Sequence, residues 1–144
     1  MKITQIGIDL IRFFEGEKLT AYKCPANVWT IGVGSTFYED GSKVKSGDVI
    51  TKQRSSELLL NTLIPFEKIV NTKVTIEIEP QQFDALVSHT FNTGGSNTLF
   101  QLVNQKAPDA EIKAWFETRY IMGGGVVLAG LVKRRKAEAK LYFS

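Results

Sequence analysis

The residues best suited to chemistry in this 144-residue chain gather in one stretch, from Glu15 to Thr36. Cys24 lies nine residues after Glu15, and Thr30 lies six residues after Cys24. Carboxyl and thiol groups serve enzymes as acids, bases or nucleophiles. The spacing alone is equally typical of a solvated glutamate, an inert buried cysteine and a strand threonine. We therefore expect any chemistry of this chain in this stretch, and its kind has to come from further observations.

An amphipathic helix places Glu15. Apolar side chains recur at the i, i+4, i+7 and i+8 spacing of one helical face, at Ile6, Leu10, Phe13 and Phe14. Thr4 is a candidate N-cap, and the pattern ends at Gly16. A carboxylate at the C-terminal end of a helix opposes the helix dipole at a cost of roughly a few tenths of a kcal/mol. The position of Glu15 therefore invites a functional explanation.

A small antiparallel sheet is predicted after this helix. β-Branched and aromatic residues alternate with turn formers, which indicates strands at 19–23, 28–33 and 43–44. Turns are predicted at 25–27 and 39–42, where the pair Asp40-Gly41 is the stronger signal. Gly32 and Gly34 indicate a bulge or a close approach of backbones. The result is a three-stranded sheet that carries Cys24 and Thr30.

The rest of the chain has a helical period. A long helix is predicted at about 51–71, capped by Thr51 and kinked or split by Pro65. Further helices begin at Pro80, at Ser96 or Asn97 and at Pro108-Asp109, and a last one covers 130–143, so the second half is expected to be all helix. We predict one α+β domain over 1–144, with a sheet lobe at about 16–50, a connecting helix at about 51–71 and a helical lobe at about 72–144 that includes the first helix.

Composition excludes several classes of protein. The net charge is +3, but no stripe of Lys and Arg is interleaved with aromatic residues as in nucleic-acid readers. A lone cysteine excludes an internal disulfide, and one His with one Cys gives no metal-ligand cluster, so we expect no cofactor. No apolar run approaches the ~20 residues of a membrane span. Asp9 and Arg12 interrupt the apolar N-terminus, which we interpret as mature structure rather than an export signal.

Several separated motifs occur together in order along the chain. The first contains Phe14-Glu15-Gly16, Leu19, Ala21-Tyr22, Cys24-Pro25 and the run 29–34; the second covers 82–88 with Phe91-Asn92 and Gly94; the third contains Trp115, Gly123-Gly124, Gly130-Leu131 and Arg134-Arg135. Together they resemble the phage-type lysozymes, the endolysin muramidases of glycoside hydrolase family 24. The pattern of that family is a Glu, eight residues, an Asp or Cys, five residues and a Thr.

The resemblance implies a cleft between the two lobes that binds peptidoglycan glycan strands. It implies hydrolysis of the β-1,4 bond between N-acetylmuramic acid and N-acetylglucosamine, with Glu15 as the general acid. Cys24 stands where many members carry an Asp that activates or orients the hydrolytic water, and Thr30 would hold that water. Inverting hydrolysis needs such an acid and such a water-activating group on opposite faces of the sugar.

The role of Cys24 has three alternatives. It is a base with a modest thiolate fraction, a mainly neutral group that hydrogen-bonds the water, or a nucleophile that attacks the anomeric carbon. We favour the first two because the family tolerates Cys at this position. Glu17 is the alternative carboxylate, and a solvated turn charge is its simpler interpretation.

The resemblance also implies binding residues. Tyr22 matches a cleft-lining aromatic, with core packing as its alternative. Ser88 and Asn92 lie one helical turn apart and suit recognition of N-acetyl and hydroxyl groups, whereas Asn92 is otherwise a helix cap near Gly94. His89 is expected to be a satisfied core or interlobe histidine rather than a catalytic one.

The basic run at 133–136 is expected to be a solvated helix face from which one Arg could reach peptide carboxylates. At Ser35, where relatives commonly place a His, no catalytic role is expected.

Two other functions stay open at this point. A lytic transglycosylase needs only one carboxylic acid, and a peptidoglycan-binding protein can keep the fold without turnover. The resemblance further implies a phage or prophage monomer held in the host cytoplasm until another protein permeabilises the membrane, after which it acts on the periplasmic cell wall. We expect no nucleic-acid partner.

Overall fold

The computed structural model describes residues 1–144 and combines helices with two small antiparallel sheets, which confirms the α+β class. The elements in chain order are α1 (Gln5–Glu15), β1 (Lys18–Lys23), β2 (Trp29–Gly32), α2 (Lys52–Lys73), α3 (Pro80–Thr93), α4 (Asn97–Asn104), α5 (Asp109–Thr118), β3 (Met122–Gly123), β4 (Val126–Val127) and α6 (Ala129–Tyr142). Two compact units form, which we call the sheet unit (Ile8–Ile64) and the helical unit (Met1–Gly7 with Pro65–Ser144). Most of α1 therefore belongs to the sheet unit, whereas the sequence suggested that it joins the helical lobe.

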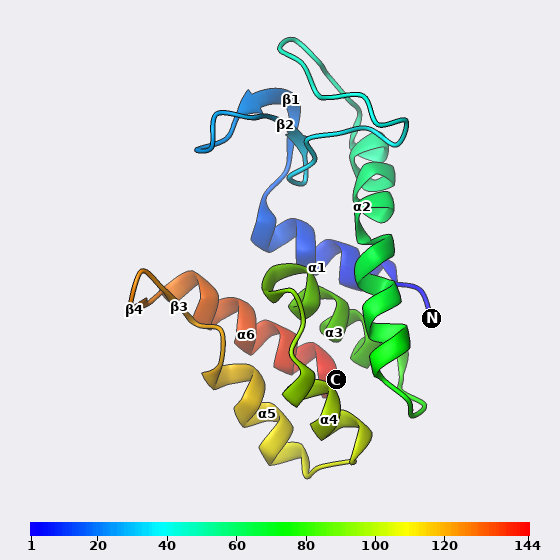
Figure 1. Ribbon diagram of the computed structural model, residues 1–144, viewed down its shortest axis with the longest axis vertical. Helices are drawn as coiled ribbons and strands as arrows, with labels where there is room; N and C mark the ends of the chain where they lie inside the picture. The colour runs from blue at the N-terminus through cyan, green and yellow to red at the C-terminus, as the bar shows by residue number, and fades with distance from the viewer. The chain divides into compact units, whose positions relative to one another are not determined.

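The sheet unit contains the stretch in which chemistry was expected (Figure 1). β1 pairs antiparallel with β2, and Tyr22 lies opposite Thr30. Ile31, Val44 and Leu58 form a buried core with partly buried side chains packed around it. The predicted third strand at 43–44 is wrong: Lys43 makes only an isolated bridge to Phe37, because the intervening turn leaves too little extended chain for a ladder.

Helix α2 begins at the predicted cap and continues through an internal proline. The Thr51 hydroxyl accepts a hydrogen bond from the Arg54 N–H at 3.1 Å, which confirms the predicted cap. The helix runs unbroken through Pro65, so of the two predicted effects, a kink or a split, the split is wrong. Proline removes one N–H donor, and the apolar residues on both sides of it keep the helix packed.

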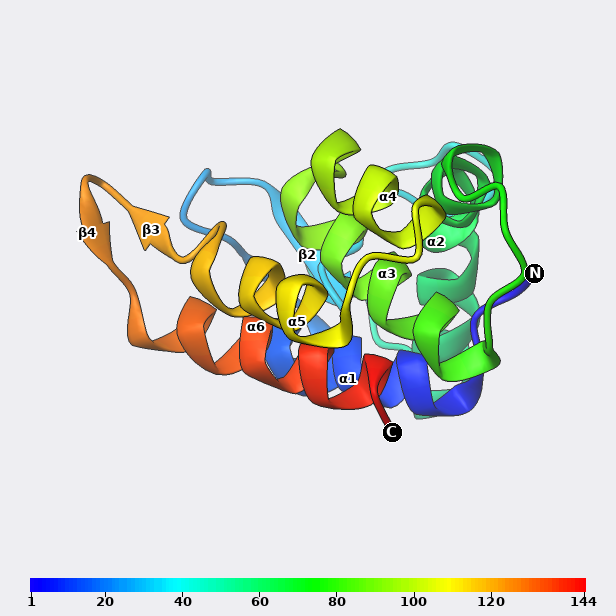
Figure 2. The same ribbon diagram turned by 90° about the horizontal axis from the view of Figure 1, so that it is seen from below.

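In the helical unit, α6 packs against α3 and α5 (Figure 2). α3 begins at Pro80 with a capping box between Glu79 and Gln82 and ends at Gly94 in the left-handed conformation. The second half is not all helix, because β3 and β4 form a hairpin that extends from the ends of α5 and α6. Gly124 and Gly125 have φ of 58° and 81°, which suits a tight two-residue hairpin turn.

The first residues of the chain are fixed within the helical unit. The Thr4 N–H donates to Asp84 Oδ1 at 2.8 Å, and the Thr4 hydroxyl also donates to this carboxylate. A Cβ on Gly7 would lie 2.6 Å from Ile3 Cγ1 and 2.8 Å from Asp84 Cγ. Only glycine fits this close approach between the start of α1 and α3.

Gly7→Ala should therefore destabilise the protein. The added methyl group must push aside a carboxylate held by two hydrogen bonds, which costs about 1–3 kcal/mol of overpacking and lowers Tm by roughly 3–10 °C. Thermal and urea unfolding measure this effect. Gly130→Ala is the matched control, since nothing lies within 4 Å of its Cβ position in α6; a loss of stability there equal to that of Gly7→Ala would contradict the packing argument.

Candidate active site

Glu15 is the last residue of α1, as predicted. The helix ends because Gly16 adopts a left-handed φ of 78°, and its N–H donates to the Arg12 carbonyl at 2.9 Å. β1 begins two residues later at Lys18. Glu15 is an exposed residue, so the turn places this acid at the surface directly before the sheet.

Cys24 lies in the turn that joins β1 to β2. The Asn27 N–H donates to the Cys24 carbonyl at 2.8 Å, and the Cys24 N–H donates to the Val28 carbonyl at 3.0 Å. Asn27 has a positive φ of 63°, a conformation that asparagine tolerates better than most residues. This tight backbone path directs N–H groups toward the partly exposed thiol.

These donors make the thiol more acidic than an ordinary cysteine. A hydrogen bond from the Val28 N–H is the largest cause that lowers the pKa of Cys24, and the Ala26 N–H and the Thr30 hydroxyl add to it, while partial desolvation opposes them. Hydrogen bonds to sulfur stabilise the thiolate relative to the thiol. The turn therefore raises the fraction of anion at neutral pH.

Thr30 lies beside Cys24. It is buried in β2, and its hydroxyl is 3.0 Å from the Val28 carbonyl as well as within reach of the Cys24 sulfur. A hydroxyl has one proton to donate and two lone pairs to accept with. Thr30 can therefore donate to one of these partners and still accept from a water. Across the ladder is Tyr22, which is half-buried, with Lys18 Nζ at 5.0 Å from the centre of its ring.

The alternative carboxylate, Glu17, has a different environment from the one expected. Its side chain is only 14% exposed, and Oε2 accepts from Arg12 Nε at 2.9 Å and from Ser55 Oγ at 2.7 Å. The interpretation as a solvated turn charge is therefore wrong. In the sequence, Arg12 was noted only as a charge in the apolar N-terminus, and Ser55, which lies 38 residues from Glu17 along the chain, was not considered.

In the helical unit, Ser88 and Asn92 occupy different environments. Ser88 is completely buried and donates to Glu138 Oε2 at 2.6 Å. Asn92 is exposed, and its Oδ1 accepts from Arg135 Nη2 at 2.5 Å. Because a guanidinium has no acceptor, the amide must face it with oxygen, and the NH₂ group of Asn92 points elsewhere.

The basic run is not a solvated face at its centre. Arg134 and Arg135 are buried, and Arg135 Nε lies 2.9 Å from Glu138 Oε1. Burial raises the pKa of Glu138, and the charge of Arg135, the Ser88 hydroxyl and Arg134 oppose that rise. The i, i+3 and i, i+4 spacing of two arginines to Glu138 is a sequence signal that predicts this cluster.

His89 is a core residue without a catalytic partner. It is buried, and its ring meets Phe116 and Tyr120 edge to face. Burial lowers the pKa of His89 to about 3, helped by the charges of Arg135 and Arg134. The core interpretation is confirmed, but the ring is not fully satisfied because Nε2 has no hydrogen-bond partner.

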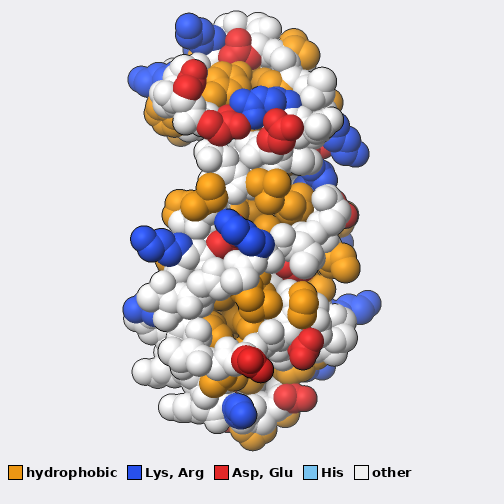
Figure 3. Space-filling model, turned by 90° about the vertical axis from the view of Figure 1, so that its right-hand side faces the viewer, with side chains coloured by type: hydrophobic (Ala, Val, Ile, Leu, Met, Phe, Trp, Pro, Cys, Tyr) orange, Lys and Arg blue, Asp and Glu red, His pale blue; other side chains and the backbone are white.

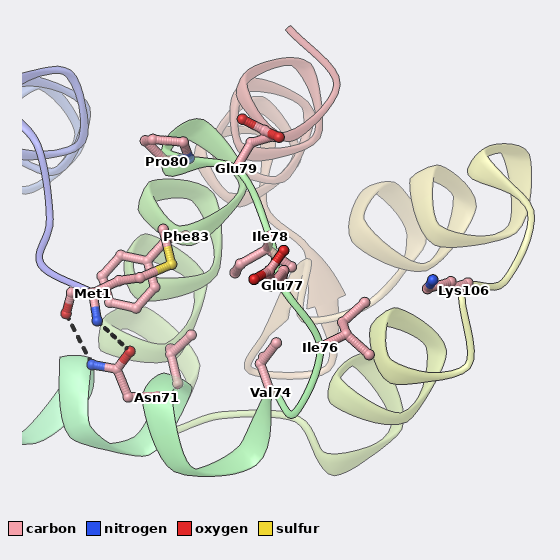
Figure 4. Close-up of a pocket in the computed structure, with 11 residues that line it drawn as sticks. Met1, Asn71, Val74, Ile76, Glu77, Ile78, Glu79, Pro80, Phe83 and Lys106 are labelled. Carbon is pink, nitrogen blue, oxygen red and sulfur yellow. Dashed lines mark hydrogen bonds between the residues drawn. The ribbon is translucent and has the colours of Figure 1, made fainter.

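One hollow of the helical unit lies apart from the predicted site residues. A pocket of about 770 Å³ in the helical unit is lined by Met1, Asn71, Phe83 and eight other residues, among which the Met1 amine donates to Asn71 (Figure 4). Basic and acidic side chains are interspersed on the face shown in Figure 3. No group of three or more potential metal-ligating side chains gathers, and no helix is long and apolar enough to cross a membrane.

The chain is similar in sequence and fold to known phage lysozymes and endolysins. The family model described as phage lysozyme matches residues 12–138. The endolysin of Acyrthosiphon pisum secondary endosymbiont phage 1 is 32% identical, covering 100% of this chain and 99% of that protein. The endolysin of Bacillus phage B103 is 36% identical over the whole chain, which spans 55% of its length. The structure of a P22 lysozyme mutant is similar with a TM-score of 0.88 at 33% identity, covering 100% and 99% of the two chains.

The chain therefore belongs to the phage lysozyme family. It is an endolysin of the glycoside hydrolase class that degrades peptidoglycan, as the motifs predict. The two alternative functions are not favoured by these similarities.

The buried His89 should make the protein sensitive to acid. The folded state keeps His89 neutral down to about pH 3, whereas the unfolded chain protonates it near 6.5, so the unfolded state binds more protons in between. Stability should fall as pH falls through this window, by up to about 1.4 kcal/mol per pH unit from this one group. Urea unfolding of the wild type and His89→Leu at several pH values tests this. The variant should show a shallower acid slope, and parallel profiles would contradict the assignment.

Proposed function

We propose that this chain cleaves the β-1,4 bond between N-acetylmuramic acid and N-acetylglucosamine by hydrolysis, with Glu15 as general acid and with Cys24 and Thr30 acting on the water. The single observation that carries the proposal is the set of donors around Cys24. A thiol that replaces a carboxylate can accept a proton only if its anion is stabilised, and the turn supplies that stabilisation.

Glu15 acts on the leaving group. Its carboxyl group, exposed at the end of α1, donates its proton to the glycosidic oxygen as the bond from that oxygen to the anomeric carbon breaks. Gly16 ends the helix immediately after it, so no further helical turn covers the carboxyl group. The acid becomes a carboxylate in this step and recovers its proton from solvent.

Cys24 and Thr30 act on the attacking water. A water that donates one hydrogen bond to Thr30 Oγ1 is held beside the Cys24 sulfur, because the two side chains are neighbours. The thiolate takes a proton from this water as the oxygen attacks the anomeric carbon, so one O–H bond breaks while one C–O bond forms. The neutral thiol then returns its proton to solvent. The same acidification also allows Cys24 to act as a nucleophile, and the stereochemistry of the product separates these mechanisms.

Two further side chains are proposed to contact the glycan. Tyr22 supplies an aromatic surface for a sugar ring. Asn92, whose oxygen is occupied by Arg135, presents NH₂ donors that suit the carbonyl oxygen of an N-acetyl group. Ser88 is not proposed as a direct contact, because it is buried and bonded to Glu138.

The compartment and the assembly state are also proposals. We propose that the protein acts as a monomer and reaches the cell wall from the host cytoplasm after another protein has permeabilised the membrane. The resemblance to phage endolysins supports this order of events.

Mass analysis of digested cell walls, with turbidity clearing as the rate, tests the proposed acid. Wild type should release reducing ends, and Glu15→Gln should clear walls at least about 100-fold more slowly because a general acid contributes on the order of 10²–10⁴-fold. Glu77→Gln, an exposed residue with the same change in charge, is the control and should match wild type. Equal clearing by Glu15→Gln would exclude Glu15, and 1,6-anhydro ends would indicate a transglycosylase instead.

A Cys24 series tests the thiolate. Cys24→Ser should lower kcat/KM on the order of 10²-fold, because a serine hydroxyl does not ionise near neutral pH. In the wild type kcat/KM should rise with pH through a value below that of an ordinary thiol, since its pKa is lowered. Cys24→Asp should stay active and move this rise to lower pH. A Ser variant as active as wild type would remove any need for thiolate chemistry.

A further inference from the structure

We infer that Glu17 and Ser55 are positioning residues that join the end of α1, which carries Glu15, to strand β2, which carries Thr30. The inference rests on the proposed function, because it assigns to these two side chains the task of setting the distance between the acid and the water-handling pair. We call the contacts among Arg12, Glu17, Ser55 and Gly32 the Glu17 clamp.

The first half of the Glu17 clamp encloses Glu15. Arg12 lies three residues before Glu15 and Glu17 lies two residues after it, and the Arg12 Nε to Glu17 Oε2 distance is 2.9 Å. The two side chains are 16% and 14% exposed, so water screens this ion pair less than a surface pair. The ion pair closes a short loop whose chain contains Glu15 and the left-handed Gly16. The backbone that carries the acid is therefore tied at both ends.

The second half connects this loop to the sheet. Ser55, completely buried in the first turns of α2, donates from its hydroxyl to Glu17 Oε2 at 2.7 Å. The same hydroxyl oxygen lies 3.0 Å from the position of a Cβ on Gly32. Gly32 lies two residues after Thr30 in β2 and pairs with Lys18 at the start of β1. The Ser55 hydroxyl therefore bonds to the segment after Glu15 and occupies the space beside Gly32, in the strand that contains Thr30.

The Arg12 side chain adds a further tie to α2, because its Nη2 donates to the Ser56 hydroxyl. The end of α1 is thus held to two consecutive residues of α2, and one of them packs against β2. All of these contacts lie within the sheet unit. Displacing an acid by about 1 Å from its productive position can cost on the order of 10²-fold in rate, so a loss of the clamp should affect turnover more than binding.

The test compares Glu17→Ala, Glu17→Gln, Ser55→Ala and the double variant Glu17→Ala/Ser55→Ala on a soluble glycan fragment. Glu17→Ala should lower kcat at least about 10-fold and leave KM within about twofold. Glu17→Gln keeps an oxygen that accepts from Ser55, so it should restore much of kcat. The double variant should lose no more activity than its more damaging single variant, because both changes break one connection.

Several outcomes would overturn the inference. The first is a Glu17→Ala enzyme with the kcat of the wild type. The second is a double variant whose loss of activity equals the sum of the losses of the single variants. The third is a Glu17→Gln enzyme that is inactive and whose pH–rate profile has lost one of its two limbs. The last outcome would make Glu17 a catalytic carboxylate, since a positioning residue leaves both limbs in place. Glu39→Ala is the matched control, because Glu39 pairs with Arg54 in the same unit and lies outside the clamp; its kcat should equal wild type.

Folding and the proposed function are monitored separately. Near-UV circular dichroism and Tm show whether each variant is folded, and a kcat that falls only in proportion to the folded fraction would count against positioning. Glu15→Gln is measured in the same assay. If it is as active as wild type, the proposed function fails, whereas an inactive Glu15→Gln beside a fully active Glu17→Ala removes only the inference drawn here.

Discussion

The proposed active site depends on one set of hydrogen bonds, those that the turn between β1 and β2 directs at the Cys24 sulfur. A thiol is a poor base at neutral pH unless its anion is stabilised. Antiparallel pairing of β1 with β2 brings Thr30 next to the turn, and the positive φ of Asn27 lets Val28 and Ala26 present their N–H groups. In the proposed mechanism, the local backbone thus compensates for the absence of a carboxylate at this position.

Glu15 and Glu17 are separated by one residue but have different environments. Glu15 is exposed at a helix end, whereas Glu17 is shielded and bonded to Arg12 and Ser55. These surroundings fit the proposed roles, because an acid must reach the substrate and a positioning carboxylate must keep its partners. The helical unit also has one buried and one exposed polar residue bonded to arginine. Glu138 is buried beside Arg134 and Arg135, whereas Asn92 is exposed and accepts a hydrogen bond from Arg135.

The helix starts and the family could be predicted from the sequence, because both depend on residues that are close together in the chain. The helix starts at Pro80, Asn97 and Asp109 follow from caps and proline, and the ordered motifs identify the family over most of the chain. The missing third strand and the short β3–β4 hairpin depend on pairing between segments, which composition does not determine. The Glu17 clamp depends on Ser55, which lies 38 residues after Glu17, and no sequence pattern predicts a contact between such distant residues.

In the proposed reaction, water activated by Cys24 and Thr30 displaces the leaving group in a single step. The most direct measurement is the anomeric configuration of the reducing end released at early times, followed by ¹H NMR before mutarotation. A single displacement at a β-1,4 bond predicts the α anomer first. Release of the β anomer would contradict a single displacement, because retention requires two displacements and would make Cys24 a nucleophile.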